Sequence, residues 1–224
     1  FDLLQFVCSN DISKLIPGKA QYNYMPNEGG GVIDDLIVYQ LHAEKYLLVV
    51  NASNIEKDWN HILKQNQKFN AKLENTSEKT ALLAIQGPKA MAAMQSICDA
   101  QIDQLSYYSH TNTTFAGVKN VLVATTGYTG AGGIEIYFDV TKAEKIWKAV
   151  MEAGAHFGIL PVGLAARYTL RLEMGYCLYG NEIDDQRSPI SAGLGWVSKP
   201  LTGFLNAALH QRSMQEGTPE KLVG

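Results

Sequence analysis

The spacing of hydrophobic and polar residues predicts both strands and helices along this chain. Short stretches of alternating or continuous apolar residues predict strands at residues 19–26, 32–39, 44–50, 71–74, 80–85, 114–118, 121–126 and 134–138. Apolar residues at helical spacing, with capping and breaking residues at the ends, predict helices at residues 1–8, 53–67, 88–94, 141–155 and 163–174. Strand pairs that are joined by short turns and interrupted by helices indicate an α+β fold.

The predicted helix at residues 53–67 has a clear start and a clear apolar stripe. Ser53 and Glu56 stand at the spacing of a capping box, in which each side chain satisfies a free backbone N–H group. The stripe that is predicted to face the protein interior consists of Ile55, Trp59, Ile62 and Leu63. A second capping box, formed by Thr141 and Glu144, is predicted to start a later helix.

Two adjacent carboxylates lie inside the predicted strand at residues 32–39, whose other side chains are mostly apolar. Successive strand side chains point to opposite faces, so Asp34 and Asp35 are predicted to lie on different faces. Because neither face has the polar pattern of a solvent-exposed one, we expect at least one carboxylate to be buried. A buried charge needs a cation, hydrogen-bond donors, a raised pKa or a ligand, so the pair indicates either a functional site or structural pairing.

The glycine-rich loop at residues 126–133 and the strand after it hold two further candidates, Tyr128 and Glu135. The loop lacks the residue order of a P-loop or a dinucleotide-binding fingerprint and leads into a strand, so nucleotide binding is not predicted. Two alternatives remain for the loop: a plain hairpin connection, or a loop shaped for a flat ligand that Tyr128 contacts. From alternation alone, Glu135 is predicted to be an exposed residue on the polar face of its strand.

The predicted helix at residues 163–174 carries Arg167 and Arg171 four positions apart. Like charges at this spacing repel mildly unless an anion lies near them. The sequence leaves two alternatives open, a pair of solvated arginines or a buried arginine that binds a carboxylate or an anionic ligand.

The composition excludes several classes of function. The chain has a formal net charge of -3 and no run of basic residues, so nucleic acid is not an expected partner. No apolar segment approaches membrane-spanning length, and no signal peptide is visible. Cys8, Cys98 and Cys177 have neither a disulfide nor a zinc spacing, and the histidines form no metal-binding pattern. We therefore predict no metal site, and the sequence offers no candidate for a catalytic nucleophile.

A series of short motifs follows one order along nearly the whole chain. It includes GGVIDDLIV at residues 30–38, VVNA at 49–52, AIQGP at 84–88, TGYTG at 126–130, GLAAR at 163–167, LRLE at 170–173 and LYGN at 178–181, with further matches at residues 10–11, 18–22, 135–136, 175 and 188–196. This ordered set resembles the T-protein family of the glycine cleavage system, the tetrahydrofolate-dependent aminomethyltransferases. No single motif is decisive, whereas their order and spacing together are specific.

The resemblance implies an interleaved two-subdomain folate-binding fold, in which antiparallel sheets have flanking helices. It assigns residues 1–196 to the folate-binding aminomethyltransferase core. Residues 197–224 are assigned to a linker and to the start of a C-terminal β domain. The chain is therefore expected to be a fragment that lacks the N-terminal segment and the C-terminal β domain of the family.

The function implied by the resemblance is methylene transfer from the aminomethyl-lipoyl arm of H-protein to tetrahydrofolate, with release of ammonia. The implied partner is lipoylated H-protein, and tetrahydrofolate is the co-substrate; neither nucleic acid nor a membrane takes part. The expected compartment is a bacterial cytoplasm, or the mitochondrial matrix in a eukaryote. This reaction needs no protein nucleophile, so the protein would act by positioning the reactants and by electrostatics.

The resemblance also assigns roles to individual residues. Asp34 is the catalytic candidate, a carboxylate that would hydrogen-bond the folate near N10 and assist proton movement. Glu135 would accept hydrogen bonds from the pterin ring. The folate pocket would also contain Asn51, Tyr128 and Arg167.

Three further positions, Asp35, Ala131 and Tyr168, are not candidates for the site. Asp35, on the opposite strand face, is expected to be structural. Ala131 stands where the family loop has an acidic residue, and Tyr168 follows Arg167 where the family has aspartate. Each departure removes a carboxylate that could orient the loop or Arg167, so both bear on turnover efficiency.

Two related functions are the alternatives. A folate-binding relative that supports iron–sulfur cluster assembly would carry a cysteine-containing motif, and Cys177 lies out of the frame of that motif. The folate domain of a flavin-linked demethylating dehydrogenase would work beside a flavin, for which this chain has no dinucleotide fingerprint.

Overall fold

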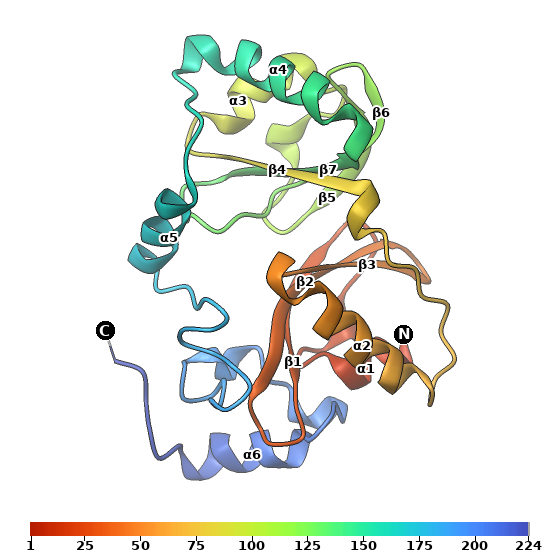
Figure 1. Cartoon of the computed structure of the whole chain (residues 1–224), viewed down its shortest axis with the longest axis vertical. Helices are drawn as coiled ribbons and strands as arrows, with labels where there is room; N and C mark the ends of the chain where they lie inside the picture. The colour runs from red at the N-terminus through yellow and green to blue at the C-terminus, as the bar shows by residue number, and fades with distance from the viewer. Residues whose placement is uncertain (224) are drawn as a thin grey trace. The chain divides into compact units, whose positions relative to one another are not determined.

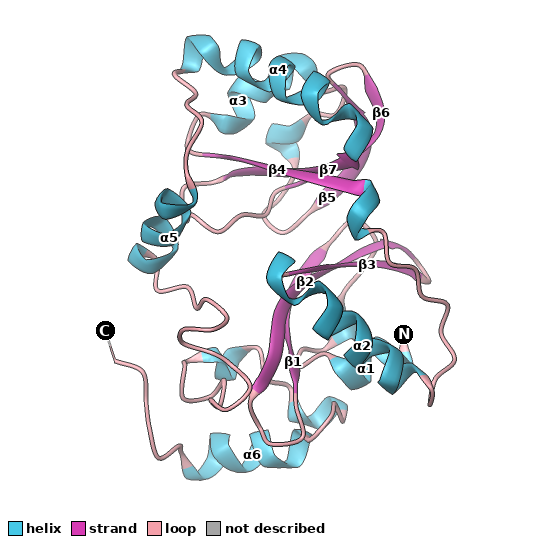
Figure 2. Cartoon of the chain, viewed as in Figure 1, coloured by secondary structure: helices cyan, strands magenta, loops and turns pink. Residues whose placement is uncertain are grey.

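The structure is a computed structural model that describes residues 1–223, and the chain divides into two compact units (Figure 1). The first unit consists of Phe1–Asn75 and Cys177–Gly224, and the second unit is Thr76–Tyr176. The second unit is thus inserted between two segments of the first. Both units combine an antiparallel sheet with flanking helices (Figure 2), which confirms the predicted α+β class.

The first unit is built on a three-stranded sheet in which β2 is the central strand. The strands, in the order β1-β2-β3, are β1 (Ala20–Pro26), β2 (Val32–His42) and β3 (Lys45–Val50). The helices of this unit are α1 (Asp2–Val7), α2 (Ile55–Asn66) and α6 (Ala207–Glu216). Residues Leu36 and Val38 of β2 pack with the apolar side chains of α1 and with Ile62 of α2, which together form the core of this sheet face.

The turn between β1 and β2 packs closely against a later segment of the same unit. Val32 N–H donates a 2.7 Å hydrogen bond to the carbonyl of Asp184, and the side chain of Asn27 donates to the carbonyl of Asp185 at 2.6 Å. A Cβ atom at Gly31 would lie 2.2 Å from the Asp185 carbonyl oxygen. This close approach of two backbones requires glycine at position 31.

Helix α2 buries only part of the apolar stripe that the sequence predicts: Ile62 is buried, and Ile55 and Trp59 are half-buried. Its buried residues are Asp58, Ile62 and Gln65, whereas Leu63 is 40% exposed. The stripe prediction is therefore wrong for Leu63, because the buried face of α2 contains polar groups. The capping-box prediction is also wrong: Asn54 is the N-cap residue, and it makes no side-chain cap hydrogen bond.

The second unit is built on a four-stranded antiparallel sheet in the order β4-β7-β6-β5. The strands are β4 (Thr80–Gln86), β5 (His110–Phe115), β6 (Val118–Ala124) and β7 (Gly133–Asp139). The helices are α3 (Ala90–Met94), α4 (Ala143–Gly154) and α5 (Leu164–Glu173). Helices α3 and α4 lie side by side over this sheet (Figure 1), and Met94 and Ile146 pack with Ile136 of β7 in its core.

Two local predictions in the middle of the chain are wrong for identifiable reasons. Residues 71–74 form no strand. The Asn66 side chain accepts the N–H of Ala71 and donates to the carbonyl of Ala71, both at 2.7 Å, so it takes the backbone groups that a partner strand would use. Thr141 does not cap α4, because it donates to the carboxylate of Asp139 in the preceding turn.

Residues 197–224, predicted as a linker, include α6 and are grouped with the first unit. His210 of α6 is 1% exposed, and its Nδ1 atom lies 3.1 Å from the hydroxyl of Tyr24 on β1. The start of a C-terminal β domain after residue 196 stays a prediction. Across residues 1–223, none of the helices combines the length and the apolar character that crossing a membrane requires.

Candidate functional site

Asp34 is a fully buried carboxylate on β2 that is held by three hydrogen-bond donors. Asn51 follows β3 directly, and because Leu36 of β2 is the partner of Val50, the antiparallel register brings Asn51 next to the aspartate pair. The backbone N–H of Asn51 donates to Asp34 Oδ2 at 3.1 Å, and its Nδ2 atom donates to Oδ1 at 2.8 Å. The Nδ2 atom of Asn54 donates to the same Oδ1 at 2.8 Å. Such donors stabilise an ionised carboxylate without a cation.

Asp35 points to the other strand face and has partners of its own. It accepts the hydroxyl of Tyr22 and the Nδ2 atom of Asn51, both at 2.8 Å. Burial raises the pKa of Asp35 to about 6, Asp34 adds to the rise, and the hydrogen bonds from Tyr22 and Asn51 oppose it. The predicted separation of the two carboxylates onto different faces is confirmed by the alternating burial along β2.

Two residues that the sequence did not single out belong to this cluster, Asn54 and Asp58. Asn54 holds Asp34 directly, and Asp58 faces Asp34 from α2. A signal for Asp58 is visible in the sequence, because it stands three positions after Ile55 and four before Ile62, on the side of the helix that is buried.

In the second unit, Glu135 of β7 is half-buried and not exposed as alternation predicted. Its Oε2 atom accepts the hydroxyl of Thr126 at 2.5 Å and the hydroxyl of Tyr137 at 3.3 Å. Thr126 begins the glycine-rich loop, so the loop and the strand are joined through this carboxylate. The pattern missed this because Thr126 lies nine residues earlier in the chain.

Tyr128 and Arg167 are stacked on each other. The guanidinium carbon of Arg167 lies 4.5 Å from the centroid of the Tyr128 ring, which is a cation–π distance. The Tyr176 ring is stacked on Tyr128 at 5.8 Å between centroids. Arg171 is 2% exposed and donates to the carbonyl of Tyr176 at 2.9 Å, so the two arginines are not a solvated pair.

Tyr128, Glu135 and Arg167 line one cavity of about 690 Å³ within the second unit. Its walls are largely apolar, with Pro88, Trp147 and other hydrophobic residues of the same unit. A volume of this size and a mostly apolar wall with a few polar groups are typical of small-molecule sites. The structure therefore brings together three of the predicted site residues in the second unit, and Asp34 with Asn51 in the first.

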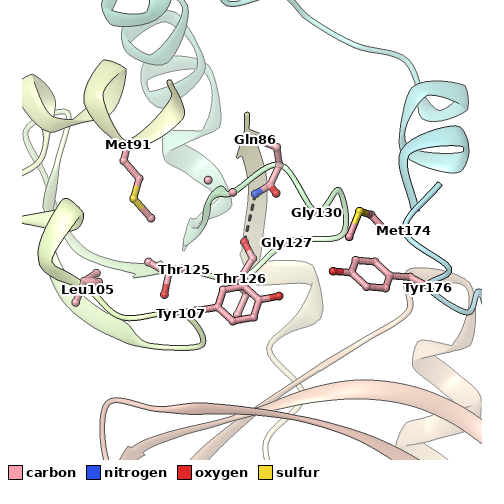
Figure 3. A pocket seen from close by; sticks show the side chains of 12 residues that line it. Gln86, Met91, Leu105, Tyr107, Thr125, Thr126, Gly127, Gly130, Met174 and Tyr176 are labelled. Carbon is pink, nitrogen blue, oxygen red and sulfur yellow. Dashed lines mark hydrogen bonds between the residues drawn. The ribbon is translucent and has the colours of Figure 1, made fainter. Parts of the chain in front are cut away.

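A second cavity of the same unit, of about 390 Å³, lies against the glycine-rich loop (Figure 3). Tyr107 and Tyr176 point toward each other in its wall, and burial, with a smaller contribution from Tyr176, raises the pKa of the Tyr107 hydroxyl. The side chain of Gln86 donates to the carbonyl of Thr126 at 3.2 Å and holds the start of the loop. The loop is thus part of a cavity wall, which favours the ligand-binding alternative for it.

Among residues 1–223, no three or more histidine, cysteine, aspartate or glutamate side chains gather in a way that could hold a metal ion. Cys8, Cys98 and Cys177 are buried, and none of the three forms a disulfide. The side chains described above offer carboxylate, amide, phenol and guanidinium groups.

Comparison with known proteins identifies close relatives of the chain. The family model described as the GCVT N-terminal domain matches residues 1–200. An aminomethyltransferase of Bacteroides fragilis is 56% identical over 225 residues, which cover 100% of this chain and 62% of that protein. An aminomethyltransferase of Flavobacterium psychrophilum is 54% identical and is covered to 61%.

A solved structure has the same fold. The crystal structure of glycine cleavage system aminomethyltransferase T from Bartonella henselae superimposes with a TM-score of 0.83 at 30% sequence identity. The match covers 96% of this chain and 58% of that one. The chain thus spans somewhat under two thirds of the length of the relatives it matches.

Proposed function

The chain belongs to the GCVT N-terminal domain family, and from this premise we propose that it is the folate-binding core of a tetrahydrofolate-dependent aminomethyltransferase of the glycine cleavage system. In the proposed reaction, lipoylated H-protein presents an aminomethyl group on sulfur. The methylene carbon passes to tetrahydrofolate, and ammonia and the dihydrolipoyl arm are released. The names of the relatives and of the matching crystal structure support this proposal.

The observation that carries the proposal is the cavity that Tyr128, Glu135 and Arg167 line together. The pterin ring of folate presents amino and ring N–H donors, and a carboxylate such as Glu135 is a suitable acceptor for them. Glu135 is already oriented by Thr126 and Tyr137 through one oxygen, Oε2. A carboxylate fixed in this way loses little conformational entropy when its other oxygen binds a ligand.

Arg167 would supply positive charge to the same cavity, where it complements the carboxylates of the folate tail. Its stacking on Tyr128 restricts the long side chain before any ligand binds. Tyr128 would therefore act on the folate both through its own ring and by placing Arg167.

Asp34 would be the catalytic residue. Its ionised form, stabilised by Asn51 and Asn54, would hydrogen-bond the folate near N10 and assist proton movement as the methylene bridge forms. Asn51 would keep the carboxylate in place and contact the folate. No protein nucleophile takes part in this scheme, and the rate would come from positioning and electrostatics.

The compartment that we propose is the bacterial cytoplasm, because the organisms of the most similar relatives are bacteria. The proposed protein partner is the lipoylated H-protein. Nucleic acid has no place in this reaction.

The test is tetrahydrofolate-dependent release of ammonia from aminomethyl-loaded H-protein. The assay should be run with this chain and with the longest version of the protein that its gene encodes. Asp34→Asn should abolish release in a chain that still folds, with a lower unfolding temperature because the new amide N–H group faces donors of Asn51 or Asn54. Asp35→Asn is the matched control, and we expect it to retain most of the activity. An active Asp34 variant beside an inactive Asp35 variant would reverse the assignment of the pair.

Tetrahydrofolate binding tests the second unit separately. Glu135→Gln keeps the size of the side chain but replaces one acceptor oxygen by a donor, so we expect binding to weaken by about tenfold or more. A substitution of the nearby Gln86, such as Gln86→Glu, is not a suitable control, because the Gln86 side chain holds the start of the glycine-rich loop. Glu152→Gln, at an exposed position of α4, should leave binding unchanged.

A further inference from the structure

Asp58 is a buried carboxyl group to which the proposed reaction assigns no role. Its side chain lies on α2 and is 1% exposed. Within the described residues, neither of its two carboxyl oxygens receives a hydrogen bond from a donor. An ionised carboxylate in such a place would lose its hydration without compensation, which is costly. This placement favours the protonated form.

The charged groups that face Asp58 come from two elements. Asp34 and Asp35 face it from β2, and Lys57 is its neighbour on α2. Asn54, the N-cap residue one helical turn before Asp58, donates to Asp34, which brings the carboxyl groups of Asp58 and Asp34 near each other. Two ionised carboxylates have no proton to donate, so this approach is favourable only when one of the two is protonated.

The surrounding donors decide which of the two holds the proton. All three donors at this place, two from Asn51 and one from Asn54, are directed at Asp34. They stabilise negative charge on Asp34 and provide nothing for Asp58. Buried carboxyl pairs that share a single proton are known to divide into one acidic and one weakly acidic group.

The direction of the titration agrees with this geometry. Burial raises the pKa of Asp58 to about 9, the contact with Asp34 adds to the rise, and the positive charge of Lys57 opposes it. At neutral pH Asp58 would therefore hold its proton.

We propose that Asp58 is a positioning residue that remains protonated at neutral pH and donates a hydrogen bond to Asp34. This bond would add a donor from α2 to the amide donors of Asn51 and Asn54 and help to fix the orientation of the Asp34 carboxylate. It also keeps the pair at a single negative charge. The effect on turnover rests on the catalytic role proposed for Asp34, whereas the protonated state of Asp58 does not.

The protonated state is tested on the chain itself, without any substrate. Infrared difference spectra or carboxyl-carbon NMR at pH 7 should show one protonated carboxyl group, which Asp58→Asn removes. Glu56→Gln, an exposed position on the same helix, should leave that signal unchanged. Absence of the signal in the parent, or its persistence in Asp58→Asn, would overturn the proposal.

The effect on turnover is tested by the pH profile of ammonia release. Asp58→Asn keeps an N–H donor toward Asp34 and cannot ionise, so it should keep activity at pH 7 and hold it above about pH 9, where the parent loses it. Asp58→Leu removes the donor and should lower kcat by about tenfold with little change in KM for tetrahydrofolate. Identical pH profiles for the parent and Asp58→Asn would refute the positioning role.

The outcomes of the spectroscopic test and of the ammonia-release test can be distinguished from each other. If the parent releases no ammonia under any condition, the proposed reaction is wrong, and the spectroscopic result on Asp58 still stands by itself. If ammonia is released but the protonated carboxyl is missing, the reaction stands and the role of Asp58 is refuted.

Discussion

The side-chain amide of Asn51 donates a 2.8 Å hydrogen bond to Asp35, a residue on the opposite strand face from Asp34. The same amide donates to Asp34, also at 2.8 Å. One asparagine therefore links two carboxylates that strand geometry separates. It can do so because it follows the end of β3, where its side chain reaches both faces of the neighbouring strand.

Replacing Asn51 by alanine should change both carboxylates. The hydrogen bond from Asn51 lowers the pKa of Asp35, so its loss should raise that pKa above about 6. Carboxyl-carbon NMR titration of the chain measures this shift. Asn54→Ala is the matched control, because Asn54 donates to Asp34 and not to Asp35. Equal titration of Asp35 in the two variants would contradict the bridging role of Asn51.

The turn between β1 and β2 gives a prediction on stability. A Cβ atom at Gly31 would lie 2.2 Å from the carbonyl oxygen of Asp185, and that oxygen belongs to a backbone that cannot move freely. Gly31→Ala should therefore destabilise the chain by about 1–3 kcal/mol in urea denaturation. At Gly29 the nearest atom would be 3.4 Å away, so Gly29→Ala should change stability by less than about 0.5 kcal/mol. If the two substitutions changed stability equally, the turn between β1 and β2 would be able to adjust to the Cβ atom added at position 31.

Much of the fold of the first unit could be predicted from the sequence, because it depends on the local pattern of hydrophobic and polar residues. Alternation along residues 32–39 correctly placed Asp34 and Asp35 on different faces and predicted that at least one of them is buried. The order of strand pairs and helices predicted the α+β class. The pattern did not give the hydrogen bonds of Asp34, because Asn51 and Asn54 lie after β3, seventeen and twenty residues further along the chain. Nor did it give the burial of Asp58, because the rotation of α2 about its axis depends on tertiary contacts.

Helix α6 shows why another part could not be predicted. Its most buried residue is a histidine, and the rest of the helix is largely polar, so no apolar stripe marks it. Its burial depends on Tyr24 of β1 and on Phe204, which are its ring contacts. Similarly, the half-buried state of Glu135 depends on Thr126 in a loop, which alternation within one strand does not reveal.

The face that α2 buries can be tested with two adjacent residues. Ile62 is 7% exposed and packs in the core of the first unit, whereas Leu63 is 40% exposed. Ile62→Ala should cost about 2–5 kcal/mol of unfolding free energy, and Leu63→Ala should cost less than about 1 kcal/mol. Urea denaturation of the two variants measures both. If Leu63→Ala lost more unfolding free energy than Ile62→Ala, Leu63 would be a buried residue of α2, as the apolar stripe predicts.

The final prediction concerns acid stability and His210. Burial lowers the pKa of this imidazole from its ordinary 6.5 to about 4, and its Nδ1 atom contacts the hydroxyl of Tyr24. In the unfolded chain the imidazole gains its proton near pH 6.5, whereas in the folded chain it stays neutral down to about pH 4. The unfolded state therefore binds more protons in this window, and the free energy of unfolding falls as the pH is lowered from 6.5 to 4.

Replacing His210 by glutamine should remove this contribution while keeping a polar side chain of similar size. The loss of stability between pH 6.5 and 4 should become smaller by roughly 3 kcal/mol, the value that corresponds to a shift of this size. His61, whose pKa burial also lowers to about 4, contributes a second slope of the same sign that the substitution leaves in place. His42→Gln, the same substitution at an exposed position at the end of β2, is the matched control. Comparing slopes rather than absolute stabilities separates titration from packing, since a packing defect at position 210 lowers stability equally at every pH. An unchanged slope in His210→Gln would show that the buried imidazole titrates normally in the folded chain.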